Sequence, residues 1–303
     1  MSPTSRLVLA ATCVGVAAMA AVAAILGIFA RGTGEFETVT SAIGETYEMA
    51  TTGVYANNAQ RVVAEGIGWD VVTLVLAVPA LLVAAWFVRK GSFRGRLFAT
   101  GLLGYFFYAY LEYSVTWAFG PLFLLFVAIY AASFLGILGM IWSLATTAGV
   151  DRLAEPFPRL GWALLNLAMS GLLTMSWLAR IRLALNDEAD ILLGETTLTV
   201  QALDLGLMVP LSVLTAVLVL RRAEVGYLLA AAFGVTYMTM TMAITAMLLS
   251  AWATEGTLEV PPVAIFGVAA VSSLVLLVRT YRPPTGVARG AMATRAAKPS
   301  PVG

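Results

Sequence analysis

Long apolar runs separated by short polar segments dominate the hydrophobic pattern of this chain. A helix needs about 20 mostly apolar residues to cross the hydrocarbon core of a bilayer. The runs are continuously apolar and lack the alternation expected of barrel strands. The pattern therefore predicts an all-α polytopic membrane protein with about eight transmembrane helices. These predicted spans are 7–30, 69–88, 97–118, 121–147, 160–179, 201–220, 225–252 and 261–278.

The first apolar run has two interpretations. Residues Met1–Arg6 are weakly basic and small residues follow, as in a secretory signal peptide. The apolar core of a signal peptide usually has about 7–15 residues, and this run is about twice as long. We therefore expect a retained first helix, with a cleaved signal peptide as the alternative.

Basic residues are concentrated in alternate polar segments. If the N-terminus is cytoplasmic, the inner segments hold 14 of the 18 Lys and Arg residues, whereas most acids lie in the outer segments. Basic residues in short loops favour the cytoplasmic side. The charges therefore predict that both termini are cytoplasmic and that the chain lies in the plasma or inner membrane.

Loop lengths repeat along the chain. Long polar segments, 31–68 and 180–200, follow the first and fifth spans, and tight basic turns follow the second and sixth. This predicts two four-helix halves in parallel repeat, 1–150 and 155–282, followed by a disordered cytoplasmic tail at 283–303.

An offset of 131 residues aligns parts of the two halves. Identity is low, so two unrelated sets of helices with the same topology remain the alternative. The aligned pairs are Pro79 with Pro210, Lys90 with Arg221 and Gly95 with Gly226.

Composition narrows the classes of function. The chain is 60% hydrophobic and 12% charged, against about 25% charged residues in an average soluble domain, so lipid is its main expected partner. A net charge of +1 gives no reason to expect a nucleic acid. The absence of histidine excludes His-ligated haem and zinc and His-dependent triads. We predict no metal site, no cofactor and no catalytic residue.

Three acids lie within the predicted spans: Asp70, Glu112 and Asp204. The predicted topology places all three in the outer third of the membrane, where an ionisable side chain is a candidate functional group. Asp70 and Asp204 fall near predicted helix starts, so helix capping is the alternative role for both. The alternative for Glu112 is a structural ion pair with Arg180 or Arg182.

Other polar side chains share helix faces with these acids. Tyr105, Tyr108 and Glu112 are spaced to lie on one face of their helix, and the seventh span carries Tyr237 among several threonines. We expect these groups to face the bundle interior and form an outward-facing polar pocket. The predicted ligand-binding residues are Glu112, Asp204, Asp70, Tyr108, Arg180, Arg182 and Tyr237.

This pocket favours binding or translocation of a small solute or lipid. Many transporters are built from repeated halves with polar groups inside the membrane, although the spans lack the paired Gly/Pro breaks that transporters often show. An intramembrane enzyme acting on a lipid is the first alternative, with Arg180 or Arg182 holding a phosphate. A non-catalytic subunit or sensor that uses the long outer loops is the second.

Overall fold

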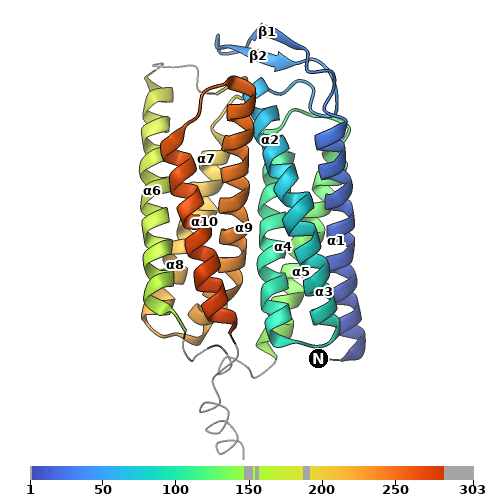
Figure 1. Ribbon diagram of the computed structural model, residues 1–303, viewed down its shortest axis with the longest axis vertical. Helices are drawn as coiled ribbons and strands as arrows, with labels where there is room; N and C mark the ends of the chain where they lie inside the picture. Colours follow the sequence, from blue (N-terminus) through green and yellow to red (C-terminus); the bar gives the residue numbers. More distant parts are fainter. Residues whose placement is uncertain (1, 147–152, 154–156, 187–191, 283–303) are drawn as a thin grey trace, which may run out of the picture.

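A computed structural model describes residues 2–146, 153, 157–186 and 192–282. The described chain is almost entirely helical, as the sequence predicts, with one small two-stranded sheet (Figure 1). The elements are α1 Pro3–Phe29, β1 Phe36–Thr40, β2 Thr46–Ala50, α2 Gln60–Val72, η1 Thr73–Ala77, α3 Val78–Arg89, α4 Phe93–Thr116, α5 Phe123–Ala145, α6 Arg159–Leu185, α7 Thr199–Leu203, η3 Asp204–Met208, α8 Val209–Leu220, α9 Glu224–Glu255 and α10 Val260–Tyr281, where η denotes a π-helix.

Seven helical segments of the described chain are long and apolar enough to cross a membrane. This confirms the prediction of a multi-pass helical membrane protein. The remaining predicted span, 97–118, corresponds to α4, a helix of 24 residues. Most α4 side chains are buried against other helices, including the tyrosines and a glutamate that lower its hydropathy.

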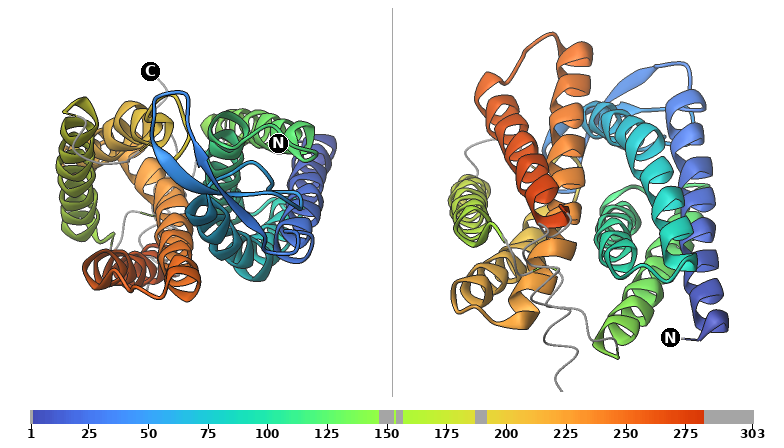
Figure 2. Two further views of the ribbon diagram at one scale, coloured as in Figure 1. Left: turned by 90° about the horizontal axis from the view of Figure 1, so that it is seen from above. Right: turned by 60° about the horizontal axis from the view of Figure 1, so that its bottom comes forward.

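The helices form two groups that lie side by side (Figure 2). In the first group, α1 packs on α3 and α5, and α4 packs on α5. In the second, α6 packs on α8, and α9 packs on α10. The two groups meet where α9 packs on α2 and α4, so α4 and α9 are the central helices of the molecule.

Two π-helices interrupt the helical segments that contain Pro79 and Pro210, the two prolines that align at the 131-residue offset. In η1 the N–H of Val78 bonds the carbonyl of Thr73, and in η3 the N–H of Val209 bonds the carbonyl of Asp204. Each π-helix lies directly before a helix with proline as its second residue. Proline has no N–H to donate and its ring crowds the preceding turn, which accounts for the wider turn at both places. The sequence analysis found no such paired interruption.

The turn after each of these segments also has matching geometry. Ser92 N bonds Phe87 O at 3.0 Å in the first turn, and Ala223 N bonds Leu218 O at 3.0 Å in the second. The residue before each donor is left-handed: Gly91 has φ 76° and Arg222 has φ 58°. These positions also differ by 131 in the sequence.

A β-hairpin covers part of the end of the bundle opposite the N-terminus, which we name the outer end after the predicted topology (Figures 1 and 2). Strands β1 and β2 pair antiparallel, with Phe36 opposite Ala50 and Thr40 opposite Thr46. The hairpin turn reaches the second group, because the Glu45 carboxylate accepts from Leu192 N at 3.0 and 3.1 Å. The sequence analysis did not predict this hairpin.

The alternative role of helix capping is wrong for Asp70 and Asp204. Helix α2 begins at Gln60, so Asp70 lies well inside it, and Asp204 lies at the α7–η3 junction. Neither helix start has a side-chain cap. The hydropathy pattern did not show the start of α2, because the residues before Trp69 are more polar than the apolar run but are nevertheless helical.

Candidate functional site

Asp204 joins three elements of the bundle. Its Oδ1 accepts a short hydrogen bond from the Tyr108 hydroxyl of α4. Its Oδ2 accepts from Trp177 Nε1 of α6 at 2.8 Å. The carboxyl group of η3 is therefore held between the first and second groups of helices, with both oxygens bonded.

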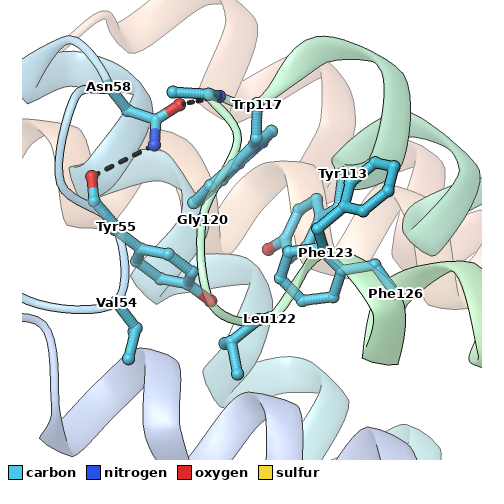
Figure 3. A pocket seen from close by; sticks show the side chains of 10 residues that line it. Val54, Tyr55, Asn58, Tyr113, Trp117, Gly120, Leu122, Phe123 and Phe126 are labelled. Atoms are coloured by element: carbon cyan, nitrogen blue, oxygen red, sulfur yellow. Dashed lines mark hydrogen bonds between the residues drawn. The ribbon is translucent and has the colours of Figure 1, made fainter.

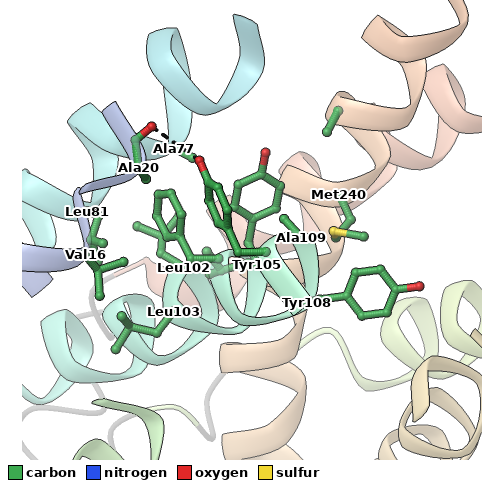
Figure 4. Packing of buried hydrophobic residues seen from close by; sticks show 14 of the residues in the cluster. Val16, Ala20, Ala77, Leu81, Leu102, Leu103, Tyr105, Tyr108, Ala109 and Met240 are labelled. Carbon is green, nitrogen blue, oxygen red and sulfur yellow. Dashed lines mark hydrogen bonds between the residues drawn. The ribbon is translucent and has the colours of Figure 1, made fainter. Parts of the chain in front are cut away.

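Helix α4 contacts both π-helices through tyrosine hydroxyls. Tyr105 bonds Thr73, the first residue of η1, at 2.7 Å, and Tyr108 bonds Asp204, the first residue of η3. Figure 4 shows Tyr105 near Leu102, whereas Tyr108 extends from the other side of α4. The first residue of each π-helix thus bonds a tyrosine of α4, but only in η3 is that first residue an acid.

Glu112 lies one helical turn beyond Tyr108 on α4 and is 7% exposed. Among the described residues it makes no hydrogen bond and no ion pair. The charged groups that act on it are three other acids, Asp204, Glu65 and Glu195. A buried carboxyl group without a hydrogen-bond or ion-pair partner is costly to maintain.

Two arginines, Arg61 and Arg180, lie among these acids. Arg61 of α2 makes ion pairs with Glu65 at 3.0 Å, with Glu259 at 2.8 Å and with Glu255 at 3.4 Å. The last two contacts connect the first group to the outer end of the second.

The expected ion pair between Glu112 and Arg180 or Arg182 does not form. Arg180 interacts electrostatically with Glu65 and Glu195 instead. Arg182 is exposed in the last turn of α6. The pairing depends on the direction in which each arginine side chain extends from α6. Sequence spacing does not reveal this direction.

We call this region the outer seam, because its residues come from both groups near the outer end. It contains more acids than bases, and aromatic side chains bound its inner part. Its residues are Glu45, Glu65, Glu112, Glu195, Asp204, Glu255, Glu259, Arg61, Arg180, Tyr108, Trp177 and Tyr237.

Glu195 lies outside the membrane-spanning segments, between α6 and α7. Partial burial raises the pKa of its carboxyl group to about 7, opposed by the charge of Arg180 and the backbone N–H of Thr199. This outer part of the seam therefore changes charge near neutral pH.

Asp70 has different surroundings from those of Glu112. It is 1% exposed and accepts a hydrogen bond from the Tyr55 hydroxyl at 2.5 Å. Gly27 of α1 lies against both residues, and a side chain at this position would overlap them. Asp70 is thus a packed, bonded group within the first group of helices and does not join the outer seam.

A small hollow lies beside this buried pair (Figure 3). Asn58 donates to the Tyr55 carbonyl at 3.1 Å and accepts from Ala118 N at 2.9 Å. The rings of Tyr55 and Trp117 meet edge to face with centroids 4.4 Å apart. These contacts fix the loop before α2 onto the end of α4, so we assign the region a structural role.

The structure thus brings together Glu112, Asp204, Tyr108, Arg180 and Tyr237 of the predicted set and separates Asp70 and Arg182 from them. The sequence analysis missed Arg61, Glu65, Trp177 and Glu195. Two spacings carried a signal: Arg61 and Glu65 are an i, i+4 pair, and Trp177 precedes Arg180 by three residues on one helix.

No family model, curated protein or solved structure matches this chain.

Proposed function

We propose that this protein binds a small organic cation from the outer side of the membrane, in the outer seam between its two groups of helices. The observation that carries the proposal is Glu112, a buried acid that faces other acids and makes no ion pair among the described residues. A cation between Glu112 and Asp204 would offset their mutual repulsion and their burial.

The arrangement of the acids favours an organic cation over a metal ion. Within the part of the chain that the structure describes, no three His, Cys, Asp or Glu side chains lie close enough to hold a metal ion. Tyr108 and Trp177 flank Asp204 instead. An alkylammonium or guanidinium group pairs with a carboxylate and is also attracted to the faces of aromatic rings, so a site that contains both kinds of side chain suits it.

The two π-helices are an argument that the helices on either side of the outer seam can move. Turns of this kind often occur at functional positions in helices, and α4 contacts both through Tyr105 and Tyr108. We infer that the two groups are copies of one four-helix unit and that they rock against each other about α4 and α9. Translocation would follow if this movement opened the seam toward the basic end.

The proposal that the outer seam faces the outer side of the membrane rests on the distribution of basic residues. Arg61 and Arg180 are the only basic side chains of the outer seam as defined above, whereas basic turns follow α3 and α8 at the opposite end. Because basic residues favour the cytoplasm, we place the seam on the outer side and both termini inside.

A binding experiment tests the proposal. The purified protein in detergent is titrated with the chloride salts of choline, methylammonium and guanidinium, with sodium chloride at equal ionic strength as the reference. We expect at least one cation to raise the melting temperature of the wild type, because a ligand at about 100 times its Kd stabilises by about 2.7 kcal/mol. Glu112→Gln and Asp204→Asn should lose this rise.

Glu37→Gln is the matched control, since Glu37 is an exposed acid of β1 outside the seam. This variant loses the same charge and should keep the cation-dependent rise. The proposal fails if none of the three cations stabilises the wild type beyond sodium, or if Glu112→Gln responds as the wild type does.

A further inference from the structure

The second group of helices has a hollow at the end opposite the outer seam. Its volume is about 510 Å³, within the range of about 300–1,000 Å³ typical of ligand pockets. The hollow lies between the start of α6 and the ends of α8 and α10. Its walls include Phe157, Arg159, Leu160, Leu220, Leu276 and Arg279.

The first group is packed closely at the comparable place. Gly136 and Gly139 of α5 lie against Thr12 and Leu9 of α1, so these two helices approach closely. In the second group α6 and α10 make fewer contacts. They are held together where Trp162 Nε1 donates to Thr280 Oγ1 at 2.9 Å, and the hollow opens beside this point.

The charges of the hollow are positive. Arg159 is the first residue of α6, and Arg279 lies in the last turn of α10. Neither makes an ion pair with a described acid. The first turn of α6 also has no side-chain cap, and uncapped N–H groups at a helix start attract anions.

We propose that this hollow binds one anionic phospholipid from the leaflet at the basic end of the bundle. Arginine side chains bind phosphate through paired N–H donors, so Arg159 and Arg279 would hold the phosphate. Leu160, Leu220 and Leu276 would contact the first part of an acyl chain. Basic pockets between transmembrane helices are known sites for anionic lipid headgroups.

This combination of walls selects a lipid over a free anion. A soluble phosphate would use the arginines but leave the exposed Leu160 and Leu220 uncovered, whereas a lipid covers both kinds of side chain. The 510 Å³ volume exceeds the need of a phosphate group alone. The site lies at the opposite end from the outer seam, so the proposal does not depend on cation binding.

Lipid retention measured by native mass spectrometry tests the proposal. The full-length protein is purified from membranes, exchanged into a mild detergent and incubated with equal amounts of phosphatidylglycerol and phosphatidylcholine. We expect the wild type to retain one phosphatidylglycerol in preference to phosphatidylcholine. Arg159→Gln with Arg279→Gln should lower retention at least tenfold.

The matched control is Arg89→Gln with Lys90→Gln, which removes two positive charges at the same end of the first group. This control should retain the lipid as the wild type does. Leu160→Trp leaves both arginines in place but fills the hollow, and it should also lose the lipid. Arg159→Lys with Arg279→Lys keeps the charge and should retain part of the binding, which separates lipid loss from misfolding.

Three results would overturn the proposal. The wild type could retain both lipids equally, which would indicate general bilayer lipid. The control could lose the lipid as fully as the arginine variant, which would indicate a diffuse charge effect. Inorganic phosphate at equal concentration could displace the lipid completely, which would indicate a soluble anion as the ligand.

Discussion

Two buried carboxyl groups in this bundle, Asp70 and Glu112, have opposite surroundings. Asp70 accepts a hydrogen bond from Tyr55 and packs against Gly27, all within the first group of helices. Glu112 lies between the groups, faces other acids and has no hydrogen-bond partner among the described residues. Burial alone therefore does not distinguish the two acids. The presence of a hydrogen-bond partner at Asp70 and its absence at Glu112 among the described residues do.

The comparison extends to the π-helices that lie near the two acids. Asp70 precedes η1, where Thr73 bonds Tyr105, and both residues are fully buried. Glu112 lies one helical turn from Tyr108, which bonds Asp204 at the start of η3, and Asp204 remains partly accessible. The same kind of backbone interruption therefore begins with a buried threonine in the first group and with an acid of the outer seam in the second.

The largest expected effect comes from filling the space beside Asp70. Gly27→Ala places a methyl group on the Asp70 carboxylate and the Tyr55 ring, and overpacking of this kind costs about 1–3 kcal/mol. Gly15→Ala is the control on the same helix, because nothing lies within 4 Å of its added carbon. It should stabilise slightly, since alanine favours a helix over glycine by up to about 1 kcal/mol. Unfolding in increasing dodecyl sulfate measures both; equal losses would contradict the close packing at Asp70.

Removing a tyrosine hydroxyl should distinguish the two sites by a smaller amount. Tyr55→Phe removes a hydrogen-bond donor from fully buried Asp70, and a buried group that loses a partner costs about 1–3 kcal/mol. Tyr108→Phe leaves Asp204 with its bond from Trp177, so its loss should be about 1 kcal/mol or less. The same unfolding assay compares them. A larger loss for Tyr108→Phe would mean that the seam is the more tightly packed of the two.

A further expected effect is the pH dependence contributed by Glu195. Partial burial raises its pKa from about 4.5 to about 7 in the folded protein, so folding takes up a proton between these values. The contribution of Glu195 therefore becomes less favourable as pH rises from about 4.5 to about 7, and changes little outside this range. Glu195→Gln should remove this slope from a plot of melting temperature against pH. Parallel curves for the two proteins would contradict the raised pKa.

Hydropathy was sufficient to predict the fold class and the approximate positions of the helices. Continuous apolar runs have few alternatives to a membrane helix. The helix starts near Asp70 and Asp204 were not predictable in this way, because polar turns outside the most apolar stretch can also be helical. The hairpin at 36–50 was missed for a related reason: its strands are short and mostly exposed.

The candidate site was only partly predictable. Glu112 and Asp204 stand out as acids in apolar surroundings, and helical spacing places Tyr108 on the face of Glu112. Trp177 and Glu65 join them through contacts between distant helices, which no local pattern records. The π-helices depend on backbone crowding before Pro79 and Pro210, so the matching prolines were the visible sign of a feature that only the three-dimensional structure identifies.

The most direct test of the account compares Glu112→Met with Asp70→Leu by melting temperature in the same detergent. We expect Asp70→Leu to melt several degrees below the wild type, because it leaves the Tyr55 hydroxyl unsatisfied in the core. Glu112→Met should melt at or above the wild-type temperature, because it replaces an unpartnered buried acid with an apolar side chain of similar length. If Glu112→Met loses as many degrees as Asp70→Leu, Glu112 is a structural group and the proposed cation site is wrong.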